Sequence, residues 1–139
     1  MTGDVGKIRY AQRSKQIIDF SGIRFGNATP SNVDGLLELA DHFFVIFEFK
    51  HISAAKMSKG QRMMIERVCD AIHGRRSPSA YCVAIVAHHD APSHQEIDAA
   101  NSKALGVRWD GKWLNVSQTN TTAMDQLNHY HNIAFHNPF

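Results

Sequence analysis

The stretch "VDGLLELADHFFVIFEFK", Val33 to Lys50, contains two strand-like runs separated by Asp41-His42. The second run, Phe43 to Lys50, is rich in Phe, Val and Ile, and its nearly continuous hydrophobicity is typical of a strand that is buried on both faces. Its end breaks this pattern, because Glu48 and Lys50 are charged. We therefore expect a β-hairpin that turns at Asp41-His42 and whose second strand is central in a sheet. The first strand of that hairpin is expected at Val33 to Ala40.

A helix and a further strand are expected after this hairpin. Ser58 is suited to be the N-cap of a helix that runs to His73, and Gly74 is suited to end it. The apolar stripe of this helix comprises Gln61, Met64, Ile65, Val68, Cys69 and Ile72. A β-rich run, Ala80 to Ala87, follows. The order strand, helix, strand favours a crossover to a parallel neighbour, so we expect a mixed sheet.

The two ends of the chain complete the expected α/β domain. Residues Arg9 to Phe20 are good helix formers and predict a first helix. Asp110-Gly111, between apolar residues in "VRWDGKW", predicts a two-residue hairpin. Thr121 or Thr122 is suited to cap a last helix that runs to about Asn132. No repeat or linker is evident, so we expect a single domain over residues 1–139, with a mixed β-sheet flanked by helices and a C-terminal hairpin and helix.

Composition sets limits on the class of protein but not on its function. The chain has 139 residues, 43% hydrophobic and 20% charged, which is ordinary for a globular domain. No apolar run approaches the ~18 residues that cross a bilayer, and the N-terminus lacks the apolar core of a signal peptide, so we expect a cytoplasmic protein without membrane contact. Cys69 and Cys82 lie in apolar segments and are expected to be buried thiols. The net charge of +2 tolerates an anionic partner without requiring one.

Three polar side chains are expected to converge at one end of the hairpin. Because strand side chains alternate between faces, Glu48 and Lys50 point the same way. Asp34 lies at the start of the preceding strand, at a distance from the turn that places it beside Glu48. Two carboxylates on neighbouring strands repel each other unless a cation lies between them, and Mg²⁺ favours such oxygen ligands. A metal-bound water, oriented or deprotonated by Lys50, would hydrolyse a phosphodiester.

This arrangement resembles the core motif of the PD-(D/E)XK nuclease superfamily, which has the restriction-endonuclease-like fold. The motif here is Asp34, thirteen intervening residues, and then Glu48-Phe49-Lys50. The expected element order also resembles that core: a helix, a three-strand β-meander, a crossover helix and a strand. The resemblance covers about Arg9 to Ala87. The sequence is also similar to small phage or prophage members of the superfamily, which implies a location in a bacterial or phage-infected cell.

The resemblance implies a role for each matched residue. Asp34, Glu48 and the Phe49 carbonyl would be ligands of Mg²⁺ or Mn²⁺, and Lys50 would be the catalytic lysine. Gln61 resembles the glutamine that several branches carry at the start of the crossover helix, where it supports the lysine or the nucleophilic water. The implied activity is hydrolysis of phosphodiester bonds in DNA, and since many relatives act as dimers, a homodimer is consistent with it.

Several alternatives stay open at this level. Lys56, Lys59 and Arg62 surround the start of the crossover helix, either as DNA-phosphate contacts or as a solvated face. Glu38 is a candidate for a further metal ligand or a partner of a cation. The histidines near Asp90 could bind zinc or a phosphate: His88, His89 and His94. The fold could also serve as a catalytically inactive module for nucleic-acid binding or assembly.

Overall fold

The structure is a computed structural model that describes residues 18–54 and 56–136. The chain divides into two compact units, residues 1–30 and 31–139. Most of the first helix expected at Arg9 to Phe20 lies outside the described residues, and its last three positions, 18–20, are not helical. In the rest of the first unit, Phe25 and Ala28 form a small bridge around Gly26.

The second unit is an α/β structure built on one five-stranded mixed sheet, with strands in the order β1-β2-β3-β4-β5. β2 and β3 are parallel, and the other neighbouring pairs are antiparallel, which confirms the expected mixed sheet. The strands are β1 (Gly35–Leu39), β2 (Phe43–His51), β3 (Tyr81–His89), β4 (Lys103–Trp109) and β5 (Lys112–Asn115). A short 3-10 turn, η1 (Ser117–Thr119), follows β5.

The first hairpin forms as expected but turns one residue earlier. Ala40 and Asp41 both have left-handed backbones, with φ of 56° and 53°, and the His42 amide donates to the Leu39 carbonyl at 3.0 Å. The turn is therefore centred on Ala40-Asp41 rather than Asp41-His42. In the described part of the chain two strands precede the crossover helix, so the three-strand meander of the resembled core is not seen there.

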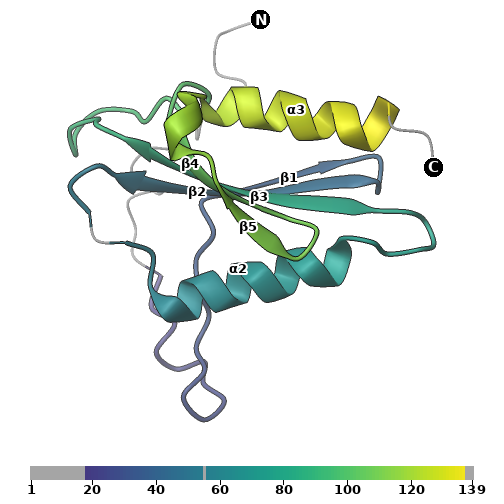
Figure 1. The fold of residues 1–139 in the computed structure, drawn as a ribbon. Helices are drawn as coiled ribbons and strands as arrows, with labels where there is room; N and C mark the ends of the chain where they lie inside the picture. Colours follow the sequence, from purple (N-terminus) through teal and green to yellow (C-terminus); the bar gives the residue numbers. More distant parts are fainter. Residues whose placement is uncertain (1–17, 55, 137–139) are drawn as a thin grey trace, which may run out of the picture. The chain divides into compact units, whose positions relative to one another are not determined.

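Two helices cover the sheet on opposite sides (Figure 1). They are α2 (Lys59–Ile72) and α3 (Ala123–His136). Ser58 caps α2 as expected, since its hydroxyl accepts the Gln61 amide at 3.1 Å. The expected apolar stripe of α2 is correct except at Val68, which is 43% exposed. Thr122 caps α3 through the Asp125 amide, and α3 continues one turn beyond the expected end.

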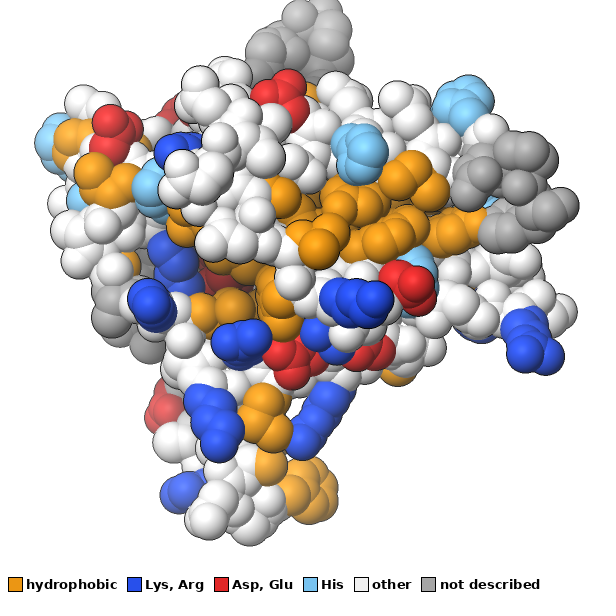
Figure 2. All heavy atoms as spheres, viewed as in Figure 1, with side chains coloured by type: hydrophobic (Ala, Val, Ile, Leu, Met, Phe, Trp, Pro, Cys, Tyr) orange, Lys and Arg blue, Asp and Glu red, His pale blue; other side chains and the backbone are white. Residues whose placement is uncertain are grey.

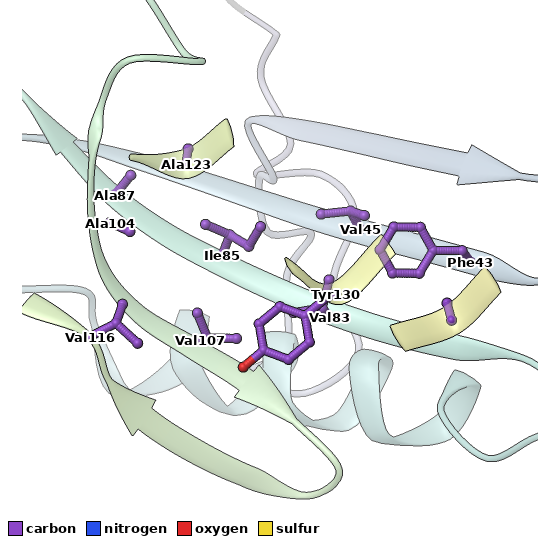
Figure 3. Close-up of a cluster of buried hydrophobic side chains, with 11 residues drawn as sticks. Phe43, Val45, Val83, Ile85, Ala87, Ala104, Val107, Val116, Ala123 and Tyr130 are labelled. Atoms are coloured by element: carbon purple, nitrogen blue, oxygen red, sulfur yellow. The ribbon is translucent and has the colours of Figure 1, made fainter. Parts of the chain in front are cut away.

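Two separate hydrophobic cores lie on the two faces of the sheet. The core beneath α3 is the larger one and is shown in Figure 3; it includes Phe43, Val45, Val83, Ile85, Val107 and Tyr130. The core beneath α2 comprises Ile46, Ile65, Cys69, Cys82 and Ala84. Both cysteines are free and buried, as expected. β2 contributes to both cores, which explains why its sequence is hydrophobic at nearly every position.

None of the helices formed by residues 18–54 and 56–136 has the length and apolar character needed to cross a membrane.

His42 joins three segments that are distant in sequence. Its ring nitrogens lie 2.9 Å from the Ser79 carbonyl and 2.6 Å from the Ala134 carbonyl, near the end of α3. We expect His42→Ala to lower the free energy of unfolding by about 1 kcal/mol, because an imidazole with one N–H donates to one of these two carbonyls and that hydrogen bond is lost. Urea denaturation measures this change, with His94→Ala in the exposed loop as the control. Equal stability of the two variants would contradict this role.

Candidate active site

Asp34 lies one residue before β1 and is fixed beside the end of β2. The register pairs Gly35 with Phe47, so its continuation by one residue places Asp34 opposite Glu48, as the sequence predicts. The Asp34 amide donates to the Phe47 carbonyl at 3.2 Å, and Asp34 Oδ2 accepts the Phe49 amide at 2.7 Å. The Asp34 side chain thus accepts a backbone hydrogen bond from β2 at a position just before the first residue of β1.

Glu48 and Lys50 lie on the face of β2 that α2 covers. Ile46, two residues before Glu48, belongs to the core beneath α2, and side chains two apart share a face. Phe47 and Phe49 lie on the other face, where their rings stack with centroids 5.9 Å apart. Glu48 is only 4% exposed, so its carboxylate lies inside the sheet–helix layer rather than at the surface.

Glu48, Lys50 and Gln61 form a closed ring of polar contacts. Gln61 Nε2 donates to Glu48 Oε1 at 2.8 Å, and Lys50 Nζ lies 3.2 Å from the same oxygen. Lys50 Nζ also donates to Gln61 Oε1 at 3.1 Å. Both ends of the Gln61 amide are therefore used, and its side chain can satisfy both neighbours in one orientation only. Gln61 therefore faces the end of β2.

The environment of Glu48 raises the pKa of its carboxyl group above the ordinary value of 4.5. The larger cause is burial, which disfavours the charged form, and the second is the negative charge of Asp34. Hydrogen bonds from Lys50 and Gln61 oppose these effects without cancelling them. The fold thus holds a carboxylate where ionisation is costly, a pattern that is enriched at functional sites.

The second oxygen of the Glu48 carboxylate, Oε2, is buried and has no hydrogen-bond partner among the described residues. A buried carboxylate oxygen without a donor costs free energy unless a donor or a cation compensates it. A metal ion bound at this site would give Oε2 the partner that it lacks among the described residues.

The other expected donors lie nearby. Asp34 stands opposite Glu48, and the Phe49 carbonyl faces the same side of β2 as the Phe49 amide that binds Asp34. In residues 18–54 and 56–136, no three His, Cys, Asp or Glu side chains gather around one point. A metal ion bound here would have two carboxylates and a carbonyl as its protein donors, with the remaining positions left to water or substrate, which is a composition that Mg²⁺ accepts.

The three expected DNA-contacting cations differ in their surroundings. Lys56, Lys59 and Arg62 are all exposed. Arg62 Nε donates to Glu66 at 3.1 Å, and its guanidinium lies 5.6 Å from the centre of the Trp113 ring. Lys56 and Arg62 line one groove, whereas Lys59 stands on the first turn of α2. Figure 2 shows Lys and Arg side chains gathered on the side of the molecule where α2 and β5 lie.

Glu38 has a different role from the ligand role considered above. Its carboxylate accepts the Asp41 amide at 2.6 Å and thereby supports the β1–β2 turn. Glu38 pairs with Phe44, near the turn and away from Glu48. Among the histidines, His88 is the register partner of Lys50, and His89 Nδ1 accepts the Ala91 amide at 3.2 Å.

Sequence reasoning missed a groove that adjoins the site. It has a volume of about 450 Å³ and lies between the start of α2 and the β4–β5 hairpin. Its floor contains Val86, the register partner of Glu48, and Gly106, the register partner of Val86. The one signal available in the sequence was a glycine inside a strand, which often marks close approach of a ligand or backbone.

Comparisons with known proteins find no relative of this chain. No family model matches it, and neither the curated proteins nor the solved structures searched contain a match.

We expect Glu48→Gln to raise the unfolding free energy of the metal-free protein at neutral pH, because burial and the charge of Asp34 together make the ionised carboxylate unfavourable despite its bonds to Lys50 and Gln61. Since the fold raises the pKa of Glu48, the ionised group costs stability above that pKa, and the cost disappears as the pH falls through it. The difference between variant and wild type is therefore expected to vanish below about pH 4, where Glu48 is protonated in the folded and the unfolded state.

Thermal unfolding across a pH series measures this difference, with Glu38→Gln as the matched exposed carboxylate. A Glu48→Gln protein that is less stable than wild type at every pH would show that Glu48 is a structural group.

Proposed function

We propose that this protein is a Mg²⁺-dependent nuclease that hydrolyses phosphodiester bonds in DNA. The observation that supports it most directly is the buried Glu48 carboxylate, with one oxygen unpartnered among the described residues and the other held by Lys50 and Gln61. Asp34 adds a second carboxylate opposite Glu48. A purely structural role would not require the fold to bury a carboxylate beside another negative charge.

The metal would be held by the Asp34 and Glu48 carboxylates and the Phe49 carbonyl. A bound Mg²⁺ supplies positive charge that neutralises the phosphate and acidifies a coordinated water. The chain contributes rigidity, because the hydrogen bond between Asp34 and the Phe49 amide ties together the two segments that carry these ligands. Such support of ligating carboxylates is common around metal sites.

Lys50 acts in this proposal as a hydrogen-bond donor toward the phosphate or the attacking water. A lysine ammonium has three N–H donors, and in the described contacts two of them are directed at Glu48 and Gln61. The third is available to a substrate oxygen. Lys50 is 30% exposed, so its ammonium group can reach a substrate while Glu48 beside it stays buried.

Gln61 is a positioning residue that couples the start of α2 to the site. Its backbone amide is bound by the Ser58 hydroxyl, and its side chain bridges Glu48 and Lys50. The Ser58 N-cap thus holds the first turn of α2 in place, and from this turn the Gln61 side chain reaches the end of β2.

The proposal predicts cleavage of DNA with Mg²⁺ or Mn²⁺ by the purified protein. We expect Glu48→Gln to abolish cleavage and Lys50→Ala to reduce the rate about 100- to 1000-fold, the usual cost of losing one donor to a transition-state charge. Gln61→Ala is expected to reduce it about 10- to 100-fold, as for other supporting groups.

A fluorescent-substrate assay measures these rates, with Glu38→Gln as a control that leaves the rate unchanged. Undiminished cleavage by both the Glu48 and the Lys50 variants would refute the assignment of the site.

Metal binding can be tested without any turnover. We expect the affinity for Mn²⁺ to weaken as the pH falls, because protons compete for Glu48, whose pKa is raised in the fold. Isothermal titration calorimetry measures the affinity, and Glu48→Gln serves as the non-binding reference. A wild-type protein that binds DNA but takes up no Mn²⁺ would instead support the inactive nucleic-acid-binding module.

A further inference from the structure

A single row of residues crosses the sheet from the candidate active site to its far edge. Glu48 pairs with Val86, Val86 with Gly106, and Gly106 with Asn115. Directly paired residues point to the same face, so this row lies on the face that α2 covers. Neighbouring strands are about 4.8 Å apart, which places Gly106 roughly 10 Å from Glu48.

An irregularity in β4 shapes this part of the face. The register between β3 and β4 shifts at Val86/Ala87, because Val86 pairs with Gly106 while Ala87 pairs with Ala104. Leu105 is thus an extra residue in β4. Ala104 and Val107 both belong to the core beneath α3, so the bulge turns Leu105 toward the groove. Bulges of this kind often re-aim a side chain next to a functional site.

Gly106 is not required by the fold at its position. A methyl group there would meet only ordinary contacts, 3.7 Å to the Leu114 carbonyl and 4.0 Å to the Trp113 ring. Its φ is also outside the left-handed range. A glycine in the interior of a strand costs stability relative to alanine, so its presence needs another reason. Open space on the floor of the groove, next to Glu48, supplies one.

The walls of the groove combine cations with a rigid aromatic ring. Trp113 is held by its indole N–H, which donates to Glu66 at 2.5 Å, and by the Arg62 guanidinium against its ring. Arg62 and Lys56 line the groove and provide positive charge. Asn115, the register partner of Gly106, adds an amide. These features match the parts of a nucleotide. The apolar floor suits the base, the cations suit the phosphate, and the Asn115 amide suits a hydrogen-bonding edge of the base.

We propose that this groove binds one unpaired nucleotide of a DNA strand whose neighbouring phosphate lies at Glu48 and Lys50. The inference rests on the proposed function, because the groove is continuous with that site through Val86. A volume of about 450 Å³ is at the lower end of the range for small-ligand sites, which suits one nucleotide. A base inside a duplex is stacked and paired and cannot enter such a groove without being extruded. The preferred substrate is therefore single-stranded DNA.

Binding of labelled oligothymidylate and of a blunt duplex of equal length, followed by fluorescence anisotropy in EDTA, tests the proposal without cleavage. We expect tighter binding of the single strand. Gly106→Val is expected to weaken single-strand binding about tenfold, the scale of one lost base contact, and Gly106→Ala to weaken it less. Lys56→Ala is expected to weaken it as well, whereas Lys112→Ala, an exposed lysine outside the groove, leaves it unchanged.

Thermal unfolding of each variant shows whether it is folded. If Gly106→Val does not fold, the binding measurements on Gly106→Ala test the proposal. The proposal is overturned if the duplex binds as tightly as the single strand, if neither is bound, or if the folded Gly106 variants bind the single strand like wild type.

Cleavage assays with Mn²⁺ separate this proposal from the proposed function. Single-strand binding that depends on Gly106, without cleavage of any DNA, would support the groove and reject the nuclease. Cleavage of both substrates, at rates that the Gly106 variants leave unchanged, would support the nuclease and reject the groove.

Discussion

The alternation of side chains along β2 is the constraint on which the rest of the structure depends. β2 lies between β1 and β3 and has a helix on each face, so its residues must fill two cores at once. The odd-numbered residues pack beneath α3 and the even-numbered ones beneath α2. Continued to its end, this pattern places Glu48 beneath α2, where only 4% of the residue is exposed. The carboxylate is buried because the strand that carries it is buried.

Once Glu48 is in that layer, its neighbours follow from its electrostatics. A buried carboxylate needs donors, and Lys50 and the amide of Gln61 provide them to Oε1. The negative charge of Asp34 disfavours the ionised form of Glu48, so it adds to the rise in the pKa of Glu48 that burial causes. The site therefore combines donors that stabilise the ionised form with a second carboxylate that destabilises it. A divalent cation would resolve this conflict, which is the physical basis of the proposed chemistry.

Much of this arrangement could be predicted from the sequence because it depends on local periodicity. The hydrophobic run of β2, the Ser58 cap and the Asp110-Gly111 turn are each encoded within a few residues, and the structure agrees with them. The hairpin register could be predicted only approximately from the loop, because a two-residue turn at Asp41-His42 would pair Asp34 with Phe49, whereas the observed register brings Asp34 opposite Glu48.

The features that sequence reasoning missed depend on contacts between distant segments. The bulge at Leu105 arises from the pairing of β4 with β3, and the groove forms only when the β4–β5 hairpin and the start of α2 come together. Val68 carries an apolar side chain at a helical spacing, yet it is 43% exposed, because no element among the described residues buries it. The sequence makes Glu38 a candidate metal ligand or partner of a cation, whereas its contact with the Asp41 amide depends on the exact geometry of the turn.

We propose that Asp34, Glu48 and the Phe49 carbonyl share one divalent cation. The most direct measurement is a crystal structure of the protein soaked with Mn²⁺, in which anomalous scattering locates the ion. We expect one anomalous peak within coordination distance of Glu48 Oε2, the Asp34 carboxylate and the Phe49 carbonyl. An ordered structure at high Mn²⁺ concentration with no peak there, or with a peak bound only by other residues, would contradict it.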